Sequence, residues 1–431
     1  MPTIREAPPV QKVASTTPAV ELPTTDKKLG TGKAHAGTGK AAAWDGKVGK
    51  KPNADIATDA SSTVRRTSAD SLLAARTGSL NGISAVSQDP DVAAVLKTYG
   101  MGEDLGRPRD RIVKWLGKVQ AGIVAADGNI DQLVTGLAEH DARRQVFLLE
   151  GLLRLYRDRY PNVVGPHLKR AKDLEDLLGN YTLHTGLLAK AKELDAPSKV
   201  LDALKENADQ ARADLETTVK TLWMPKSGSE RVPAIADLLK DLARTTWEDA
   251  GTDRTFLLDS MRAELKHLDK SEFNMDDLVD GMHELRRQMR WTTVYTEALD
   301  GLVQLDETRN PVAAYACLNN DPIASSKFAN LPPPTCEPNP VKFSKSLYLA
   351  NMRAVLDLGT LKDEMESIEF IGKAYVQSGK ADSDKEGVKK ALKLLGEPDD
   401  RLKRIAKEAD HIYSQIRHRE LFEAMRDELI G

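Results

Sequence analysis

The sequence of 431 residues contains few cysteines, few aromatic residues and no long hydrophobic run. Its two cysteines, Cys317 and Cys336, lie 19 residues apart and lack the spacing and the histidine partners of a metal site. We therefore expect reduced thiols and no disulfide framework. No apolar stretch approaches the roughly 18 residues that span a bilayer, so we expect no transmembrane helix. The first 13 residues lack the apolar core of a secretory signal peptide.

The scarcity of aromatic residues also bears on the fold class. They make up 5% of the chain against 29% charged residues, and alternating β-branched runs are hard to find. This balance predicts an all-α fold. Residues 1–90 carry 12 Lys and Arg against 8 Asp and Glu, a net charge of +4, so with −3 for the whole chain the remainder carries −7. An acidic body argues against a general nucleic-acid binder, although it is compatible with a local basic face, and we expect no sequence-specific binding of nucleic acid.

Residues 1–90 differ in composition from the rest of the chain. They are rich in Pro, Ser, Thr, Gly and Lys and show no sustained hydrophobic period. Such a segment buries too little apolar area to offset the entropy of ordering, so we predict a disordered tail. Its run GTGKAHAGTGK resembles a phosphate-binding loop, but Ala34 and Ala41 stand where that motif needs Gly and Ser or Thr. We interpret the run as a flexible linker.

Helical periodicity begins near residue 91 and follows a similar order in two halves. Apolar residues at helical spacing predict helices over 108–125, 137–161, 165–194 and 198–223, and then over 233–247, 254–268, 281–303, 341–378, 385–395 and 399–429. A break at 225–228 separates a first bundle, 91–225, from a second, 226–431. A Pro-rich insertion at 304–340 interrupts the second half, and its three consecutive prolines exclude helix. The matching order suggests duplicated four-helix bundles.

One signature, His-x-x-Arg-Arg, occurs in both halves. Its residues are His140, Arg143 and Arg144 in the first half, and His283, Arg286, Arg287 and, one turn on, Arg290 in the second. The second set falls at i, i+3, i+4 and i+7 and shares one helix face. Guanidinium groups on a rigid helix can donate charge-assisted hydrogen bonds to phosphate oxygens, two at a time. The alternative is a solvated face paired with neighbouring acids, such as Glu139, Asp141 and Glu284.

Each signature is followed by a helix that contains a Leu-Gly pair. The pairs are Leu178-Gly179 and Leu358-Gly359, the second with Asp363 close behind. This order resembles the CHAD domain, the α-helical domain named for its histidines, over roughly residues 105–430. The resemblance implies two four-helix bundles related by pseudo-twofold symmetry and a basic groove that binds inorganic polyphosphate. The polyanion-binding residues that we carry over are His140, Arg143, Arg144, Lys169, Arg170, His283, Arg286, Arg287, Arg290 and Lys362.

The chain departs from the family pattern at several positions that the family tends to fill with charged residues. They are Phe147, Leu148 and Glu150 in the first His helix, Thr182 and Leu183 after the first Leu-Gly pair, and Thr293 in the second His helix. These departures deplete the first half of the groove in charge.

No catalytic constellation stands out. The chain contains neither a H-E-x-x-H metal motif nor a G-x-S-x-G motif between a strand and a helix, so we expect no enzyme, no metal and no cofactor. Our first hypothesis is a cytoplasmic protein, associated with polyphosphate granules, that binds polyphosphate or a similar polyanion. The alternative is a helical protein-interaction scaffold whose tail recruits a protein partner or directs non-classical secretion.

Overall fold

The computed structural model describes residues 90–100, 106–125, 132, 142–226, 228–229, 231–334, 337 and 339–429. They all belong to one compact unit, Ser79–Gly431. The predicted tail up to residue 89, His140 and Cys336 lie outside the described residues. Cys317 lies within them as a free, exposed thiol. Among the helices described, none combines the length and the apolar character needed to cross a membrane.

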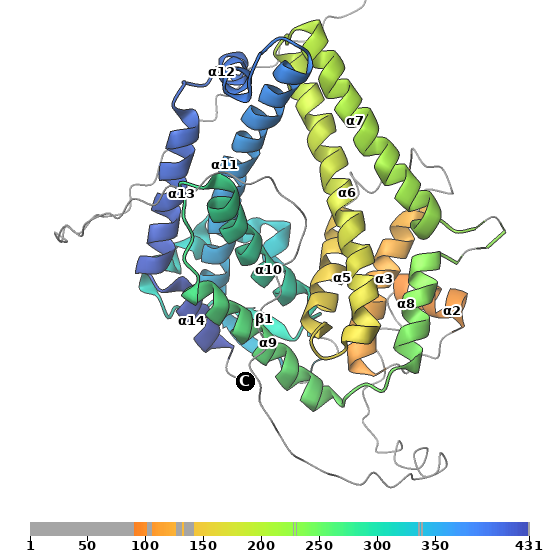
Figure 1. Cartoon of the computed structure of the whole chain (residues 1–431). Coiled ribbons are helices and arrows are strands. Elements are labelled where there is room, and N and C mark those ends of the chain that lie inside the picture. Colours follow the sequence, from red (N-terminus) through yellow and green to blue (C-terminus); the bar gives the residue numbers. More distant parts are fainter. Residues whose placement is uncertain are drawn as a thin grey trace, which may run out of the picture. The chain divides into compact units, whose positions relative to one another are not determined.

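The described chain is mostly helical, as its composition predicts (Figure 1). The first half contains α2 (Pro90–Tyr99), α3 (Arg107–Ala125), α5 (Ala142–Tyr156), α6 (Pro161–Glu193), α7 (Ser198–Thr218) and the π-helical η2 (Val219–Trp223). The second half contains α8 (Pro233–Arg244), α9 (Ala250–Lys270), the π-helical η3 (Leu278–His283), α10 (Glu284–Ala298), α11 (Lys345–Gln377), α12 (Asp384–Leu395), α13 (Arg401–His418) and α14 (Leu421–Glu428).

Local sequence signals account for most of these helices. Apolar residues at helical spacing in α3 are buried: Ile112, Trp115, Leu116, Val119 and Ile123. Proline stands at the first turn of α6 and α8, where its missing N–H is not needed. The Asp249 carboxylate accepts hydrogen bonds from two backbone N–H groups at the start of α9, and Asp277 does the same for η3. Gly396, with φ of 74°, ends α12.

Several predicted helix boundaries are wrong; the first His helix, for example, ends at Tyr156 instead of 161. For three others the local backbone or capping gives the reason. The second His helix ends at Ala298 instead of 303, because Asp300 and Gly301 adopt positive φ angles of 51° and 90°. The helix predicted from 341 begins at Lys345, where the Ser344 hydroxyl caps it. The helix predicted over 399–429 is broken between α13 and α14 by Glu420, whose φ is 52°.

Two short strands replace the missing helical ends. β1 (Val303–Asp306) and β2 (Val341–Ser344) pair in parallel, with Val303 opposite Val341. The Pro-rich insertion between them forms the 3-10 segments η4 (Ala313–Asn320), η5 (Pro322–Ser325) and η6 (Lys327–Ala329). Residues 332–334, the three prolines, lie outside helix and strand, as predicted.

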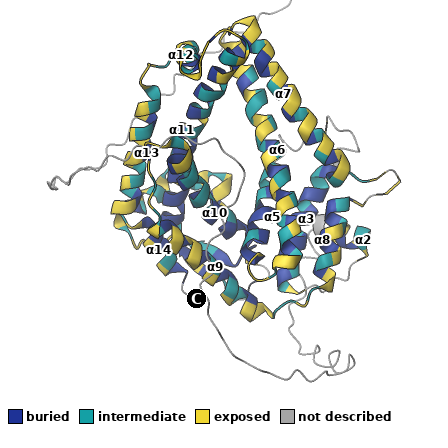
Figure 2. Ribbon diagram, in the orientation of Figure 1, coloured by how far each residue is buried: buried dark blue, intermediate teal, exposed yellow. Residues whose placement is uncertain are grey.

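The long helices α6 and α11, of 33 residues each, organise the packing. α6 packs against α5 and α7, α11 packs against α10 and α12, and α5 contacts α10 (Figure 1). One buried core extends from α2 through α5 and α10 to α14 (Figure 2). A separate buried cluster joins the C-terminal ends of α6 and α11 with α7 and α12. α8, placed by the sequence in the second bundle, packs against α3 and α6, and the boundary at 225 stays a prediction.

A buried ionic network ties the insertion to the first half. The Arg111 side chain, 1% exposed, donates to the carboxylates of Asp253 in α9 and Glu337 in the insertion. Arg107 also donates to Glu337, at 2.7 Å, and to Asp300, at 3.2 Å. The network therefore fixes the insertion against α3 through paired charges that are shielded from water.

Candidate functional site

A cleft of about 610 Å³ lies between α6 and α11, with residues of α5, η3 and α10 at its base. Six of the ten residues predicted from the sequence line it: Arg143, His283, Arg286, Arg287, Arg290 and Lys362. The structure therefore brings Arg143 of the first His helix onto one cleft with the arginine stripe of the second. Arg144 lines the hollow that continues this cleft, and His140 lies outside the described residues.

The two parts of the duplicated signature contact each other in both halves. A Cβ placed on Gly179 would stand 2.6 Å from Nη2 of Arg143, and one on Gly359 would stand 2.9 Å from Nε of Arg286. In each half, the arginine of His-x-x-Arg therefore lies over the glycine of the following Leu-Gly pair. A side chain at either position would displace the guanidinium that occupies this space.

Arg286 and Arg290 are the two half-buried arginines of the cleft for which the described residues provide no ion pair. Among the described residues, the buried Nε atom of each has no hydrogen-bond partner, and neither guanidinium forms an ion pair. Burial lowers the pKa of Arg290 to about 10, and the positive charge of Arg286 contributes to the shift. Burial also lowers the pKa of Arg286. Acids act on both groups through space, Asp363 and Glu366 on Arg286 and Glu175 on Arg290, and the Arg290 guanidinium lies 4.2 Å from the centre of the Phe147 ring. None of these contacts is a hydrogen-bonded ion pair, so a bound anion would stabilise both partly desolvated guanidinium groups.

The other predicted cations near the cleft each face a carboxylate. The pairs are Arg143 with Glu175, Arg144 with Glu297, Arg287 with Glu284 and Lys362 with Glu366, at N–O distances of 2.5 to 2.7 Å. Pairing with a neighbouring acid, the alternative considered from the sequence, is therefore correct for Arg287. It does not apply to Arg286 or Arg290.

His283 lies at the end of η3 and lines the cleft. Burial lowers the pKa of its imidazole, and the charge of Lys362 lowers it further. The ring is therefore mostly neutral at pH 7, where it can donate one hydrogen bond and accept another. An anion beside it would favour the imidazolium and add a positive charge to the cleft.

Lys169 and Arg170 do not line the cleft. The ammonium group of Lys169 donates to Asp173 one turn further along α6, at 2.6 Å, on an exposed face. Arg170 donates to Asp237 of α8 at 3.0 Å. The structure therefore places this predicted pair away from the other site residues, in surface ion pairs of small energetic value.

The departures from the family pattern have distinct structural roles. Thr182 and Leu183 line the cleft without adding charge to it. The Thr293 hydroxyl accepts a hydrogen bond of 3.0 Å from the buried Asn351, so this position joins α10 to α11. Glu150 is buried, and its Oε2 atom has no hydrogen-bond partner among the described residues.

Replacing Glu150 with glutamine is expected to stabilise the protein by about 2–3 kcal/mol at pH 8 and to have little effect near pH 4.5. Burial and then the charge of Glu175 raise the pKa of Glu150 to about 7, above its unfolded value of 4.5. Between pH 4.5 and about pH 7, the Glu150 carboxyl of the folded protein therefore keeps its proton while that of the unfolded chain loses it. The stability that the protonated Glu150 contributes is lost as the pH rises through about 7. Urea unfolding at both pH values measures the difference. Glu193→Gln, on an exposed residue, should show none; an equal effect in both variants would contradict the assignment.

Sequence reasoning missed Glu175 and the contribution of the insertion. Glu175 lies one turn before Gly179 on the same face of α6, so helical spacing could have placed it beside Arg143. The insertion brings Ile323 and Phe328 to the hollow that Arg144 lines. That placement depends on the return path of a loop, for which the sequence carries no periodic signal.

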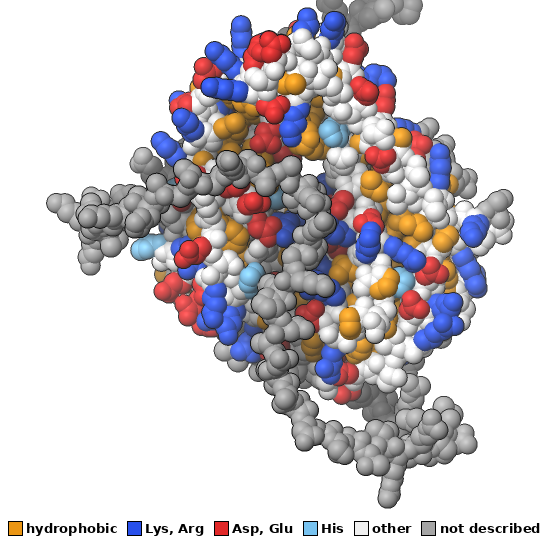
Figure 3. Space-filling view, viewed as in Figure 1, with side chains coloured by type: hydrophobic (Ala, Val, Ile, Leu, Met, Phe, Trp, Pro, Cys, Tyr) orange, Lys and Arg blue, Asp and Glu red, His pale blue; other side chains and the backbone are white. Residues whose placement is uncertain are grey.

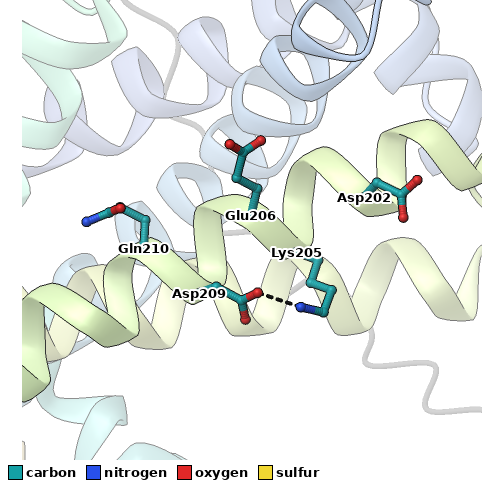
Figure 4. Close-up of a pocket in the computed structure, with 5 residues that line it drawn as sticks. All are labelled: Asp202, Lys205, Glu206, Asp209 and Gln210. Atoms are coloured by element: carbon teal, nitrogen blue, oxygen red, sulfur yellow. Dashed lines mark hydrogen bonds and ion pairs between the residues drawn. The ribbon is translucent and has the colours of Figure 1, made fainter.

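Elsewhere on the molecule, charges of both signs are mixed on the face shown in Figure 3. A hollow of about 470 Å³ runs along α7 and is lined by Asp202, Lys205, Glu206, Asp209 and Gln210 (Figure 4). Lys205 donates to Asp209 at 2.5 Å, one turn along the same helix. All five side chains come from one helix face, so no groups from different elements converge there.

Comparisons of the chain with models of protein families, with curated proteins and with solved structures find no match. The geometry of the cleft is therefore the basis for assigning a function.

Proposed function

We propose that the protein binds inorganic polyphosphate, or a similar polyanion, in the cleft between α6 and α11 without catalysing a reaction on it. The observation that carries the proposal is the pair of partly buried guanidinium groups of Arg286 and Arg290, which form no ion pair with the described residues and whose Nε atoms have no hydrogen-bond partner there. Arginine binds phosphate oxygens through planar, charge-assisted hydrogen bonds. A phosphate would supply the negative charge that the fold leaves out.

The composition of the cleft supports an extended anion. Its lining contains six Lys and Arg side chains against four carboxylates, in a chain whose formal charge is −3. The cations come from four helices: Arg143 from α5, Lys190 from α6, Arg286 and its neighbours from α10, and Lys362 from α11. Successive phosphates along one chain could therefore contact cations on several walls.

The contact of an arginine with a glycine in both halves supports a CHAD-like arrangement. In this proposal, the α5–α6–α7 and α10–α11–α12 sets belong to two four-helix bundles related by pseudo-twofold symmetry. Arg143 on Gly179 and Arg286 on Gly359 are then equivalent contacts. The alternative function, a scaffold that recruits a partner or directs secretion, rests on residues 1–90, nearly all of them outside the described part of the chain.

Titration of the full-length protein into fluorescently labelled long-chain polyphosphate tests the proposal by anisotropy. We expect saturable binding whose affinity falls on the order of 100-fold between about 50 and about 300 mM salt, because three or four phosphate contacts release counterions. Absence of binding at the lower salt concentration would overturn the proposal. Binding that does not respond to salt would also overturn it, because contacts with phosphate must respond.

A further inference from the structure

A second hollow, of about 650 Å³, continues the cleft past Arg143, Arg286 and Arg290. Unlike the cleft, it has mainly apolar walls. We call it the apolar groove and define it by Phe147, Ile323, Phe328, Met352, Val355 and Leu356. The same arginines therefore face a polar cleft on one side and an apolar groove on the other.

The Pro-rich insertion supplies one wall of the apolar groove. Ile323 lies in η5 and Phe328 in η6, opposite Leu356 of α11. The backbone carbonyl of Phe328 accepts a hydrogen bond of 3.0 Å from the Tyr348 hydroxyl of α11, which holds this wall in place. In the first half, α5 ends at Tyr156 and α6 begins at Pro161, so no equivalent segment exists there. The insertion thus makes the two halves different at the site.

The apolar groove exposes hydrophobic side chains beside the unpaired charges. Phe328 is 41% exposed and Leu356 is 55% exposed; they are two of the four large hydrophobic residues that the described chain leaves exposed. Exposed apolar side chains gathered at one hollow mark a binding site more often than single scattered ones do. Ligand sites typically combine such walls with a few convergent polar groups, which here are the guanidinium groups of Arg286 and Arg290.

Charge complementarity selects the class of ligand. Five cationic side chains line the apolar groove against two carboxylates, Glu297 and Asp363. We propose that the groove binds the alkyl or acyl chain of an amphipathic anion whose phosphate or carboxylate head group contacts Arg286 and Arg290. This inference rests on the anion site proposed above and adds the apolar part of the ligand. The insertion then converts a general anion cleft into a site that recognises a hydrophobic chain.

Isothermal titration calorimetry of the full-length protein with ethyl, butyl, hexyl and octyl phosphate tests the inference. We expect the affinity to rise about threefold for each added CH₂ group, because each methylene leaves water for the groove. Leu356→Ser should reduce the affinity gained per CH₂ group while leaving the binding of inorganic polyphosphate unchanged. Val279→Ser is the matched control, because Val279 is 54% exposed and lines neither hollow.

The outcomes separate the inference from the proposed function. An affinity independent of chain length, with polyphosphate still bound, would overturn the inference alone. A dependence that is as steep in Leu356→Ser as in the parent protein would overturn the assignment of the groove. A chain-length dependence without polyphosphate binding would support the inference and overturn the polyphosphate function. Absence of binding by every phosphate compound would overturn both.

Discussion

Replacing Arg111 with methionine should lower the free energy of unfolding by about 3–5 kcal/mol at pH 7, because the change leaves an uncompensated buried carboxylate. Asp253, 2% exposed, would keep only the Tyr156 hydroxyl as a hydrogen-bond partner among the described residues, at 2.8 Å. Burial already raises the pKa of Asp253 while Arg111 opposes the shift. Without the arginine, Asp253 should take up a proton on folding. The loss of stability should therefore shrink as the pH falls toward 5.

Urea unfolding at pH 7 and pH 5 measures this effect, with Arg157→Met as the matched control. Arg157 pairs with Asp158 on the surface, where its side chain is 54% exposed, so its replacement should cost less than about 0.5 kcal/mol at either pH. If the two variants lost the same small amount, the network around Arg111 would not hold α3, α9 and the insertion together.

Replacing both Arg286 and Arg290 with glutamine should weaken polyphosphate binding by at least about 100-fold, because each charge-assisted contact contributes about 1.5–3 kcal/mol. The free energy of unfolding of this double variant should equal that of the parent protein or exceed it by up to about 2 kcal/mol. The change removes two partly desolvated charges that form no ion pair. Anisotropy and urea unfolding measure the two effects. Opposite effects on binding and stability are typical of residues kept for function.

Lys169→Gln with Arg170→Gln is the control for charge. It also removes two positive charges, but from an exposed face of α6 outside the cleft. We expect its affinity for polyphosphate to stay within about threefold of the parent protein. Equal losses in both double variants would mean that polyphosphate responds to net charge and not to the cleft. A large loss of stability in the Arg286 and Arg290 variant would instead assign these arginines a structural role.

Helical spacing predicted the central part of the site. The i, i+3, i+4 and i+7 positions placed Arg286, Arg287 and Arg290 on one face, and all three line the cleft. Spacing alone could not show which of these arginines has an acidic partner. Whether Glu284 pairs with Arg287 depends on the rotamers of both side chains, which the sequence does not determine. It also could not show that Arg143 meets the same cleft, since this depends on the contact between α5 and α10.

The errors arose where tertiary contacts decide the local structure. β1 and β2 have four residues each, and their pairing joins Val303 to Val341, beyond the reach of any local pattern. Lys169 and Arg170 are close to other basic residues in the sequence. In the structure they lie on a face of α6 outside the cleft, where they pair with Asp173 and Asp237. The three consecutive prolines of the insertion exclude helix at their own positions, but nothing in its sequence indicates that Phe328 would face the arginines.

The most direct test of the central claim is an NMR measurement of the arginine Nε–H groups in ¹⁵N-arginine-labelled protein. Signals of Arg286 and Arg290 are assigned by their absence from the single glutamine variants. Addition of inorganic polyphosphate should shift these two signals and leave that of the exposed Arg157 in place, because only the cleft guanidinium groups gain a phosphate partner. Binding that shifts surface arginines but leaves both Arg286 and Arg290 unchanged would contradict the assignment of the cleft as the anion site.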